Sequence, residues 1–310
     1  MSGWRLVGDV GGTNARFARA AGGAIGERRV YAVPEYVSFY DALRRYLSET
    51  GGIEGCESGA IGVAGPVDAG YVKLTNAPWI IDAKETGRLL GDVPAKLVND
   101  LQAVAAGLPH LADKDLTHLG AARPQGAHRP MLALNVGTGF GAASAIPAMG
   151  SWISCGCEPG HMALGAVDAD ELSVVEGFPS VEHLLSGRGV QALYGRLAAR
   201  SGAQMNGARS GAEIFASAGS DPVAAETVRY FSRLLGRVAG DLALATGAWG
   251  GVYLCGSVVQ GWEAVADIGE FRSSFEAKSV MTDRMRSVYS GVIEMDDISL
   301  FGLTHLDVDA

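Results

Sequence analysis

The chain has 310 residues, of which 48% are hydrophobic and 19% are charged, a balance typical of a globular protein and unlike that of a disordered one. This length allows two domains with separate cores. Lys and Arg total 25 and Asp and Glu total 34, a net charge of −9. An acidic chain without a basic run is a poor partner for nucleic acid or for an anionic membrane surface.

The sequence predicts a cytoplasmic protein. No apolar run approaches the length of a membrane span, and Asp9 interrupts the first apolar stretch too early for a signal peptide. Four cysteines are sparse in a chain of this length, so we expect reduced thiols. They are Cys56, Cys155, Cys157 and Cys255.

A β-hairpin is predicted near the N-terminus. Leu6-Val7 begins an apolar run and Phe17-Ala18 resumes it, with the pair Gly11-Gly12 between them. Both glycines can take φ > 0 and close a tight two-residue turn. Without side chains at its tip, such a turn lets the backbone approach a ligand closely.

The tip of this hairpin is rich in hydrogen-bond donors. The N–H groups of the turn, the hydroxyl of Thr13 and the amide of Asn14 would point at one spot, which suits a phosphate group. Asp9 would then lie where a metal ion beside the phosphates needs a carboxylate, directly or through water. The alternative is an ordinary glycine hairpin at the edge of a sheet.

Strands alternate with helices over residues 1–109, which predicts an α/β domain. Predicted helices begin after Ser38 and Asp82 and cover 101–106. Predicted strands cover 59–64, 71–74 and 95–98, and Gly65-Pro66 ends the first of these three.

Polar sequence from Pro109 to Pro130 separates this domain from a second one, 110–297. Strands are predicted at 131–136, 142–146, 251–255 and 288–295, a short helix at 180–185, and a long helix from the Asp221-Pro222 pair to about residue 245. A last helix, 298–306, follows Asp296-Asp297 as a possible cap. We expect this C-terminal segment, 298–310, to pack back on the first domain.

The second domain contains another glycine turn, Gly137-Thr138-Gly139, and a further glycine, Gly256, after a buried strand. The spacing up to Ala142 fits a loose dinucleotide-binding fingerprint, but that fingerprint requires a helix at this point. Pro147 and its neighbours argue for a strand instead. Two phosphate-binding turns, one in each domain and facing each other across a cleft, are the better interpretation.

Asp100 follows a predicted strand, at the end where open α/β sheets bind their ligands. A carboxylate there can accept a proton from a substrate hydroxyl and make it a better nucleophile toward phosphorus. The alternative is a helix N-cap, which spacing alone favours. The neighbouring Asn99 is either a turn residue or a ligand of hydroxyl groups.

The segment from Cys155 to His161 is dense in possible ligands. Cys155, Cys157 and His161 could bind zinc, although no fourth ligand is evident. Alternatively, Glu158 and His161 bind the hydroxyls of a polyol, or the segment is a polar loop with two buried thiols. Glu182 has no decisive signal of its own.

These motifs, in this order, resemble the bacterial ATP-dependent glucokinases, a sugar kinase branch of the actin-like ATPase superfamily. The matching segments span nearly the whole chain: 6–16, 65–67, 74–79, 98–100, 137–139, 158–161, 185–187, 250–256 and 271–275. The resemblance implies a two-domain actin-like (ribonuclease H-like) α/β fold with mixed sheets flanked by helices and an interdomain cleft. It also implies a homodimer that uses ATP and Mg²⁺ to phosphorylate a hexose, with glucose preferred.

The resemblance implies a role for each matching residue. Asp100 is similar to the catalytic base, and Asp9 to a residue near Mg²⁺. The positions that match sugar ligands are Asn99, Glu158, His161 and Glu182. The positions that match nucleotide-binding motifs are Gly8, Asp9, Gly11, Gly12, Thr13, Asn14, Gly137, Thr138, Gly139 and Gly256.

The chain departs from the family pattern at three positions. Cys157 and Pro159 replace glycines in the sugar loop, and proline fixes φ and removes an N–H group. Ser257 replaces a glycine beside the nucleotide. These departures leave open a kinase of mannose, fructose or an amino sugar, and a non-catalytic sugar-sensing relative.

Overall fold

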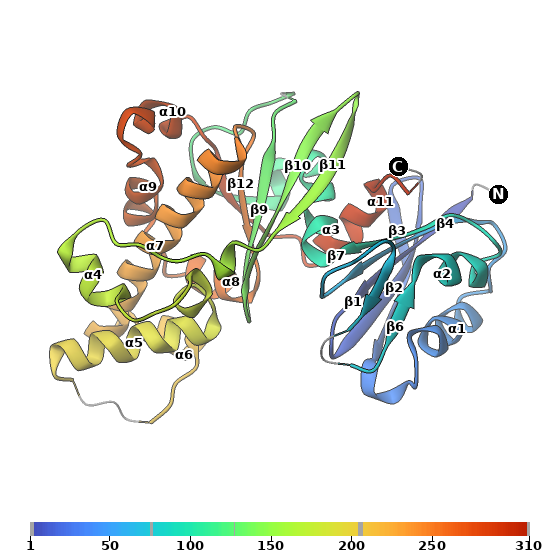
Figure 1. Ribbon diagram of the computed structural model, residues 1–310, viewed down its shortest axis with the longest axis horizontal. Coiled ribbons are helices and arrows are strands. Elements are labelled where there is room, and N and C mark those ends of the chain that lie inside the picture. The colour runs from blue at the N-terminus through green and yellow to red at the C-terminus, as the bar shows by residue number, and fades with distance from the viewer. Residues whose placement is uncertain (1–2, 75–76, 127, 204–206, 309–310) are drawn as a thin grey trace. The chain divides into compact units, whose positions relative to one another are not determined.

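The computed structural model describes residues 3–74, 77–126, 128–203 and 207–308, and Figure 1 shows their secondary structure. The chain forms two compact units. The first comprises Met1–Leu111, Trp152–Gly156 and Met295–Ala310, and the second comprises Ala112–Ser151 and Cys157–Glu294. Part of the predicted motif at 74–79 lies outside the described residues, because 75–76 are not among them.

The first unit is built on a five-stranded mixed sheet in the order β3-β2-β1-β4-β7. Its strands are β1 (Trp4–Val10), β2 (Asn14–Ala21), β3 (Ala24–Ala32), β4 (Cys56–Val63) and β7 (Ala95–Asn99). The first three form antiparallel pairs, whereas β1, β4 and β7 run parallel. The parallel part therefore brings three strand ends together at one edge.

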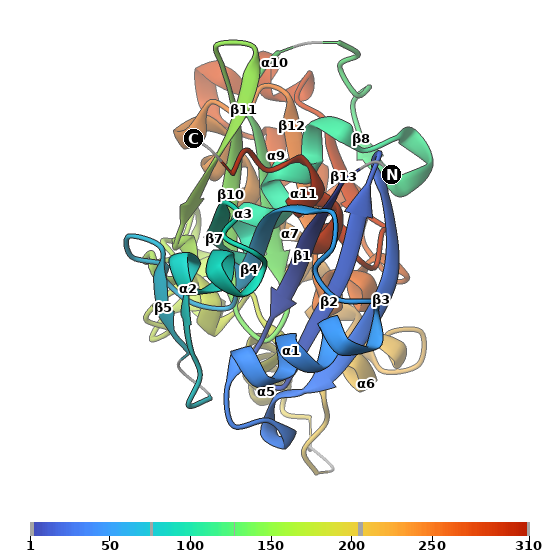
Figure 2. The ribbon, with the colours of Figure 1, turned by 90° about the vertical axis from the view of Figure 1, so that its right-hand side faces the viewer.

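Helices cover both faces of this sheet (Figure 2). Leu6 and Phe17 belong to a core with α1 (Phe39–Glu49), whereas Val7 belongs to a second core with α3 (Asp100–Gly107) and α11 (Ile298–His305). Successive residues of a strand point to opposite faces, so the central strand must be apolar on both. In the second core, Leu300 and Leu303 of α11 pack with Ala103 of α3.

The other elements of the first unit are short. Two strands, β5 (Tyr71–Lys73) and β6 (Ile80–Asp82), form a separate antiparallel pair that leads into α2 (Ala83–Leu89). The predicted caps Ser38 and Asp82 are confirmed, because each side chain accepts from a backbone N–H of the first turn. Asp297 precedes α11 but its side chain makes no capping hydrogen bond, so that detail was wrong.

A six-stranded sheet has the order β11-β10-β9-β12-β13-β8, and all of its strands except β11 lie wholly within the second unit. Its strands are β8 (Leu116–Gly120), β9 (Met131–Val136), β10 (Phe140–Ala148), β11 (Ser151–Cys157), β12 (Gly251–Cys255) and β13 (Ser290–Ile293). The pairs β9–β12 and β12–β13 are parallel, and β9–β10 and β13–β8 are antiparallel.

Helices of the second unit gather around α7 (Pro222–Thr246), which follows the predicted Asp221-Pro222 start. The others are α4 (Ala169–Val175), α5 (Gly187–Ser201), α6 (Gly211–Ala216), α8 (Ser257–Glu263), α9 (Ile268–Glu276) and α10 (Thr282–Arg286).

Short 3₁₀ turns occur in both units. They are η1 (Val33–Glu35), η2 (Leu108–His110), η3 (Asp113–Asp115), η4 (Pro159–His161), η5 (Val181–His183) and η6 (Ser279–Met281).

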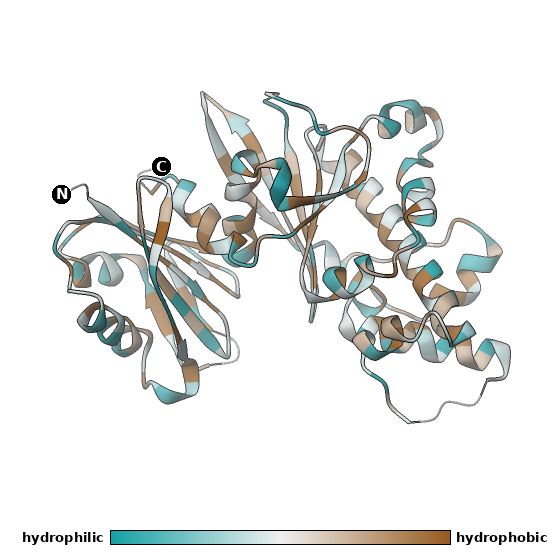
Figure 3. Ribbon diagram, turned by 180° about the vertical axis from the view of Figure 1, so that it is seen from behind, coloured by the Kyte–Doolittle hydropathy of each residue, from teal (hydrophilic) through white to brown (hydrophobic). Residues whose placement is uncertain are grey.

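Close packing of α7 against α9 uses a glycine. A Cβ on Gly236 would lie 2.1 Å from the carbonyl oxygen of Phe271, so no side chain fits there. Aromatic and aliphatic side chains, including Phe231 and Trp262, complete a large core. Figure 3 shows hydrophobic positions recurring along the helices and strands. Within the described ranges, no helix is long and apolar enough to cross a membrane.

Candidate active site

In the first unit, the predicted site residues gather where parallel strands end. Val10 on β1 is in register with Val63 on β4, and Val63 is in register with Asn99 on β7. Asp9 directly precedes Val10, and Asp100 directly follows Asn99. The sheet therefore places Asp9, Asn99 and Asp100 at its carboxyl edge, as the sequence predicts.

The β1–β2 turn differs in detail from its prediction. The N–H of Gly11 donates to the carbonyl of Asn14 at 2.9 Å, so the tip is Gly12-Thr13 rather than Gly11-Gly12. Neither Gly11 nor Gly12 has a positive φ, and that expectation was wrong. The carbonyl of Thr13 also accepts from the N–H of Val33 at 2.8 Å. This second hydrogen bond fixes the tip, whose Thr13 side chain is exposed.

Gly8 is buried within β1 and not at the turn. A Cβ there would lie 2.8 Å from Cδ1 of Ile61 and 3.0 Å from Cδ1 of Phe17. This packing explains the glycine without any ligand. We therefore leave Gly8 out of the candidate site.

Asp9 forms an ion pair with Arg16, its direct partner on β2. Nη1 of Arg16 lies 2.9 Å from Oδ2 of Asp9, whose side chain is 19% exposed. Burial raises the pKa of Asp9, and the Arg16 guanidinium opposes that rise only in part. The arrangement presents a partly desolvated carboxylate that uses one of its two oxygens for Arg16, which suits a residue near a hydrated cation.

The structure gives the helix cap to Asn99, not to Asp100. Oδ1 of Asn99 accepts from the N–H of Leu101 at 2.9 Å, and the N–H of Asn99 donates to Oε1 of Gln102 at 3.1 Å. Nδ2 of Asn99 donates to the carbonyl of Gly65 at 3.3 Å. The Asp100 cap reading was therefore wrong, because the helix starts one residue earlier than that reading needs.

Asp100 is the first residue of α3 and is half-buried. Its Oδ1 lies 2.9 Å from the N–H of Leu101. The first turn of a helix carries a partial positive charge, which favours a carboxylate. Asn99 is the cap of the helix, and the Asp100 carboxylate lies beside it at the N-terminus of α3.

In the second unit, the Gly137–Gly139 turn joins two antiparallel strands. The N–H of Gly137 donates to the carbonyl of Gly139 at 2.9 Å, and β10 follows at once. A strand at this place excludes the dinucleotide-binding fingerprint, which needs a helix. The carbonyl of Gly137 accepts from the N–H of Gly187 at 2.8 Å, so the start of α5 lies against the turn.

Gly256 ends β12 beside the same turn, with φ +102° at the N-cap of α8. A Cβ there would lie 2.4 Å from Oδ1 of Asn135 and 2.6 Å from the carbonyl oxygen of Val136. Both the backbone conformation and the close approach therefore require glycine. Ser257 begins α8, and its Oγ would lie 3.8 Å from a Cβ on Gly137.

Glu182 lies against the turn as well. Its Oε2 accepts from the N–H of Phe140 at 3.0 Å, and its Oε1 lies 3.8 Å from Nη2 of Arg188. Glu182, Ser186 and Arg188 line a cavity of about 190 Å³. Glu182 is therefore a residue of this site and not a solvated surface glutamate.

The loop with Glu158 and His161 packs close by. A Cβ on Gly160 would lie 2.3 Å from the carbonyl oxygen of Phe140, and the N–H of Val181 donates to the carbonyl of Met162 at 2.9 Å. Glu158 and His161 are both exposed. Pro159 is the first residue of η4, where a missing N–H costs nothing, so the backbone accommodates this departure.

The two cysteines before Glu158 are not joined in disulfides. Cys155 and Cys157 are exposed, so the expectation of buried thiols was wrong. Strand β11 lies at the edge of its sheet, which leaves these side chains in solvent. Within the described ranges, no three His, Cys, Asp or Glu residues are arranged to hold a metal ion.

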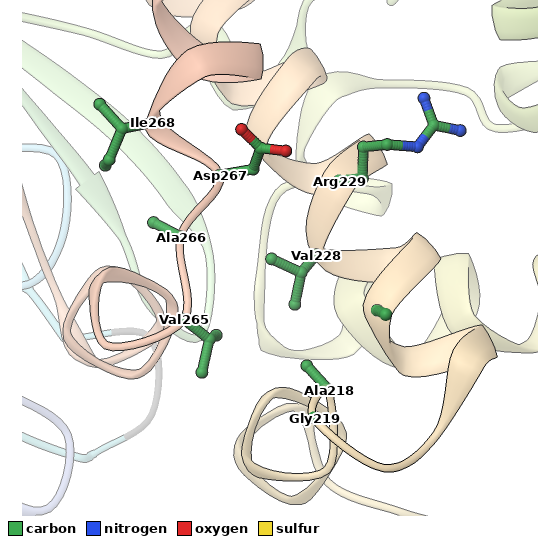
Figure 4. A pocket seen from close by; sticks show the side chains of 9 residues that line it. Ala218, Gly219, Val228, Arg229, Val265, Ala266, Asp267 and Ile268 are labelled. Carbon is green, nitrogen blue, oxygen red and sulfur yellow. The ribbon is translucent and has the colours of Figure 1, made fainter.

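A larger cavity, of about 580 Å³, lies between α7 and the segment joining α8 to α9. Figure 4 shows Val228, Val265 and Ala218 around it, with Arg229 and Asp267 among its polar side chains. None of the predicted site residues lines this cavity. We do not include it in the candidate site.

Sequence reasoning gave no role to Arg16 or Arg188. Both lie in or beside a motif that it used, Arg16 at the end of 6–16 and Arg188 directly after 185–187. For Arg16 the signal was a cation next to a predicted phosphate turn, whereas Arg188 had no such neighbour in the sequence. Only the structure shows which carboxylates they face.

Comparisons with known proteins identify the family. A family model described as Glucokinase matches residues 6–309. The glucokinase of Caulobacter sp. (strain K31) is 34% identical over 307 residues, which cover 96% of this chain and 93% of that protein. The bifunctional protein glk of Burkholderia orbicola (strain AU 1054) is 36% identical over 97% of this chain. The chain spans about half, 48%, of that relative's length.

A crystal structure of glucokinase from an Antarctic psychrotroph matches with a TM-score of 0.87, at 28% identity and over 98% of both chains. The fold class that the resemblance implied is confirmed. This chain belongs to the glucokinase family.

Proposed function

We propose that this protein transfers the γ-phosphate of ATP to the 6-hydroxyl of glucose. The observation that carries the proposal is the position of Asp100. It lies at the carboxyl edge of the first sheet, in the first turn of α3, directly after the cap residue Asn99. Family membership supplies the reaction class, and this carboxylate supplies the base that the reaction needs.

Asp100 would accept the proton of the sugar 6-hydroxyl as that oxygen forms a bond to the γ-phosphorus. The bond from phosphorus to the bridging oxygen breaks, and ADP leaves with the electron pair. Positioning and charge stabilisation dominate such a transfer. Asn99, Glu158, His161 and Glu182 are the proposed ligands of the sugar hydroxyls.

The two turns would bind the phosphates of ATP. In the first unit these are the N–H groups from Gly11 to Asn14, and in the second unit those of Gly137 to Gly139. Gly256 would allow the adenosine close to the start of α8. Mg²⁺, when bound, neutralises charge on the phosphates, and the partly desolvated Asp9 carboxylate suits a place beside it.

A different sugar as phosphoryl acceptor is the second candidate, because Cys157 and Pro159 replace glycines in the loop that holds Glu158. A kinase of mannose, fructose or an amino sugar would keep Asp100 and both turns. A non-catalytic sugar sensor is less consistent with the retained Asp100. We also propose a cytoplasmic homodimer, which light scattering on the purified protein would test.

The deciding measurement is ADP release from MgATP with a panel of hexoses, for wild type and Asp100→Ala. We expect rapid turnover on glucose and loss of turnover by a factor of about 10² to 10⁴ in the variant, with nucleotide binding retained. Turnover on another hexose but not on glucose would identify that hexose as the substrate. An active Asp100→Ala enzyme would refute the assigned base.

A further inference from the structure

One carboxylate joins the two parts of the proposed site in the second unit. Glu182 belongs to η5 and is a proposed sugar ligand, yet its Oε2 accepts a hydrogen bond from the N–H of Phe140 at 3.0 Å. Phe140 is the residue directly after the Gly137–Gly139 turn. The carboxylate therefore holds the C-terminal side of the turn to which we assign phosphate binding.

The glycine at position 139 supports this reading. Gly139 has no positive φ, so its backbone conformation is open to other residues. A Cβ at this position would nevertheless lie 2.6 Å from Oε2 of Glu182. A side chain at position 139 would therefore displace the Glu182 carboxylate from its place against the turn.

The two oxygens of Glu182 have different surroundings. Oε2 accepts the hydrogen bond from Phe140, whereas Oε1 lies 3.8 Å from Nη2 of Arg188. The Glu182 side chain is 26% exposed and lines the cavity of about 190 Å³. One oxygen can therefore bind a ligand while the other keeps its hydrogen bond to Phe140.

We propose that Glu182 is a positioning residue for the nucleotide turn, in addition to its proposed role toward the sugar. This inference rests on the proposed function and extends it. A charge-assisted hydrogen bond to a backbone N–H is stronger than a neutral one, so its loss leaves the turn less ordered before nucleotide arrives. Nucleotide affinity then falls even when no sugar is present.

The test is binding of the ATP analogue AMPPNP with Mg²⁺ to the sugar-free protein, measured by calorimetry. We expect Glu182→Ala to weaken binding about tenfold. Glu182→Gln keeps an oxygen that can accept from Phe140, so its affinity should stay within about threefold of wild type. Melting curves check that each variant is folded.

The matched control is Glu158→Ala, which removes another proposed sugar ligand. Within the described ranges, the Glu158 carboxylate makes no hydrogen bond to the turn. Its loss should leave AMPPNP affinity unchanged. An equal loss in Glu158→Ala and Glu182→Ala would overturn the inference, because it would show a general effect of sugar-side charge.

Gly139→Ala provides a second variant. The added methyl group clashes with Glu182, so AMPPNP binding should weaken, and the double variant with Glu182→Ala should bind no worse than Glu182→Ala alone. Wild-type affinity in Glu182→Ala would overturn the inference and leave the kinase proposal standing. Failure of the wild-type chain to bind AMPPNP would overturn both.

Discussion

Arg16 and Asp9 are direct cross-strand partners, and Nη1 of Arg16 lies 2.9 Å from Oδ2 of Asp9. The pair lies beside the first glycine turn, on the two strands that this turn joins. Burial raises the pKa of the Asp9 carboxyl, and the Arg16 guanidinium opposes that rise. Several expectations depend on contacts of this kind.

Arg16→Ala should make activity more sensitive to acid. Burial raises the pKa of Asp9 and Arg16 opposes that rise, so removing Arg16 raises the pKa further. The ionised carboxylate is then lost at a higher pH as the solution is acidified. The acid limb of kcat/KM for MgATP should move to higher pH, and Arg16→Lys should restore part of the difference. An unmoved limb would contradict this role.

Asn99→Ala should destabilise the first unit by about 1–2 kcal/mol, because Leu101 loses its capping acceptor and Gly65 loses a donor. Urea unfolding measures the difference. Asn99→Asp keeps the acceptor and should cost less. Asp100→Asn should also cost less, since Asp100 is not the cap. Equal losses for Asn99→Ala and Asp100→Asn would argue against this assignment.

Glu171→Gln should lower the free energy of unfolding by about 3 kcal/mol. Glu171 is fully buried, and its Oε1 lies 3.1 Å from Nε of Arg237, whose side chain is 12% exposed. The substitution leaves the Arg237 charge without its buried partner. Glu85→Gln is the matched control, because its pair with Arg88 is exposed and should contribute less than about 1 kcal/mol.

Stability should fall modestly between pH 6.5 and about 4. The rings of His110 and His305 stack with centroids 3.7 Å apart, and burial with the neighbouring His110 and Arg5 charges lowers the pKa of His305 to about 4. Below its unfolded pKa of about 6.5, the unfolded chain binds a proton that the folded chain does not, so acid favours unfolding. The effect is modest because both histidines are partly exposed.

His305→Phe keeps a ring at this position but removes its titration. We expect urea midpoints of this variant to depend less on pH over that window than those of wild type. Carboxylates also make stability depend on pH at the acid end of this window. The urea midpoints of wild type and His305→Phe are therefore compared with each other at each pH. Identical slopes would show that the histidine pair does not contribute.

Local patterns predicted much of the fold. The Asp221-Pro222 start of α7 and the Ser38 and Asp82 caps were correct because each depends on side chains within one helical turn. The apolar runs at 59–64 and 131–136 became central strands. Periodicity and capping act over a few residues, so a single sequence records them well.

Predictions that needed exact register were less successful. The first turn has its tip one residue later than expected, and the cap of α3 belongs to Asn99 instead of Asp100. A shift of one residue changes which group faces the ligand. Spacing does not resolve such a shift, because both Asn and Asp cap helices well.

The sequence by itself determined the family, the fold class and the residue types of the proposed site, because motifs in a fixed order define all three. Tertiary structure decided which of those residues meet. The contact between Glu182 and Phe140 joins positions 42 residues apart, and that between Arg5 and the end of α11 joins positions about 300 apart. Such contacts depend on how sheets and helices pack, and no local pattern in the chain encodes them.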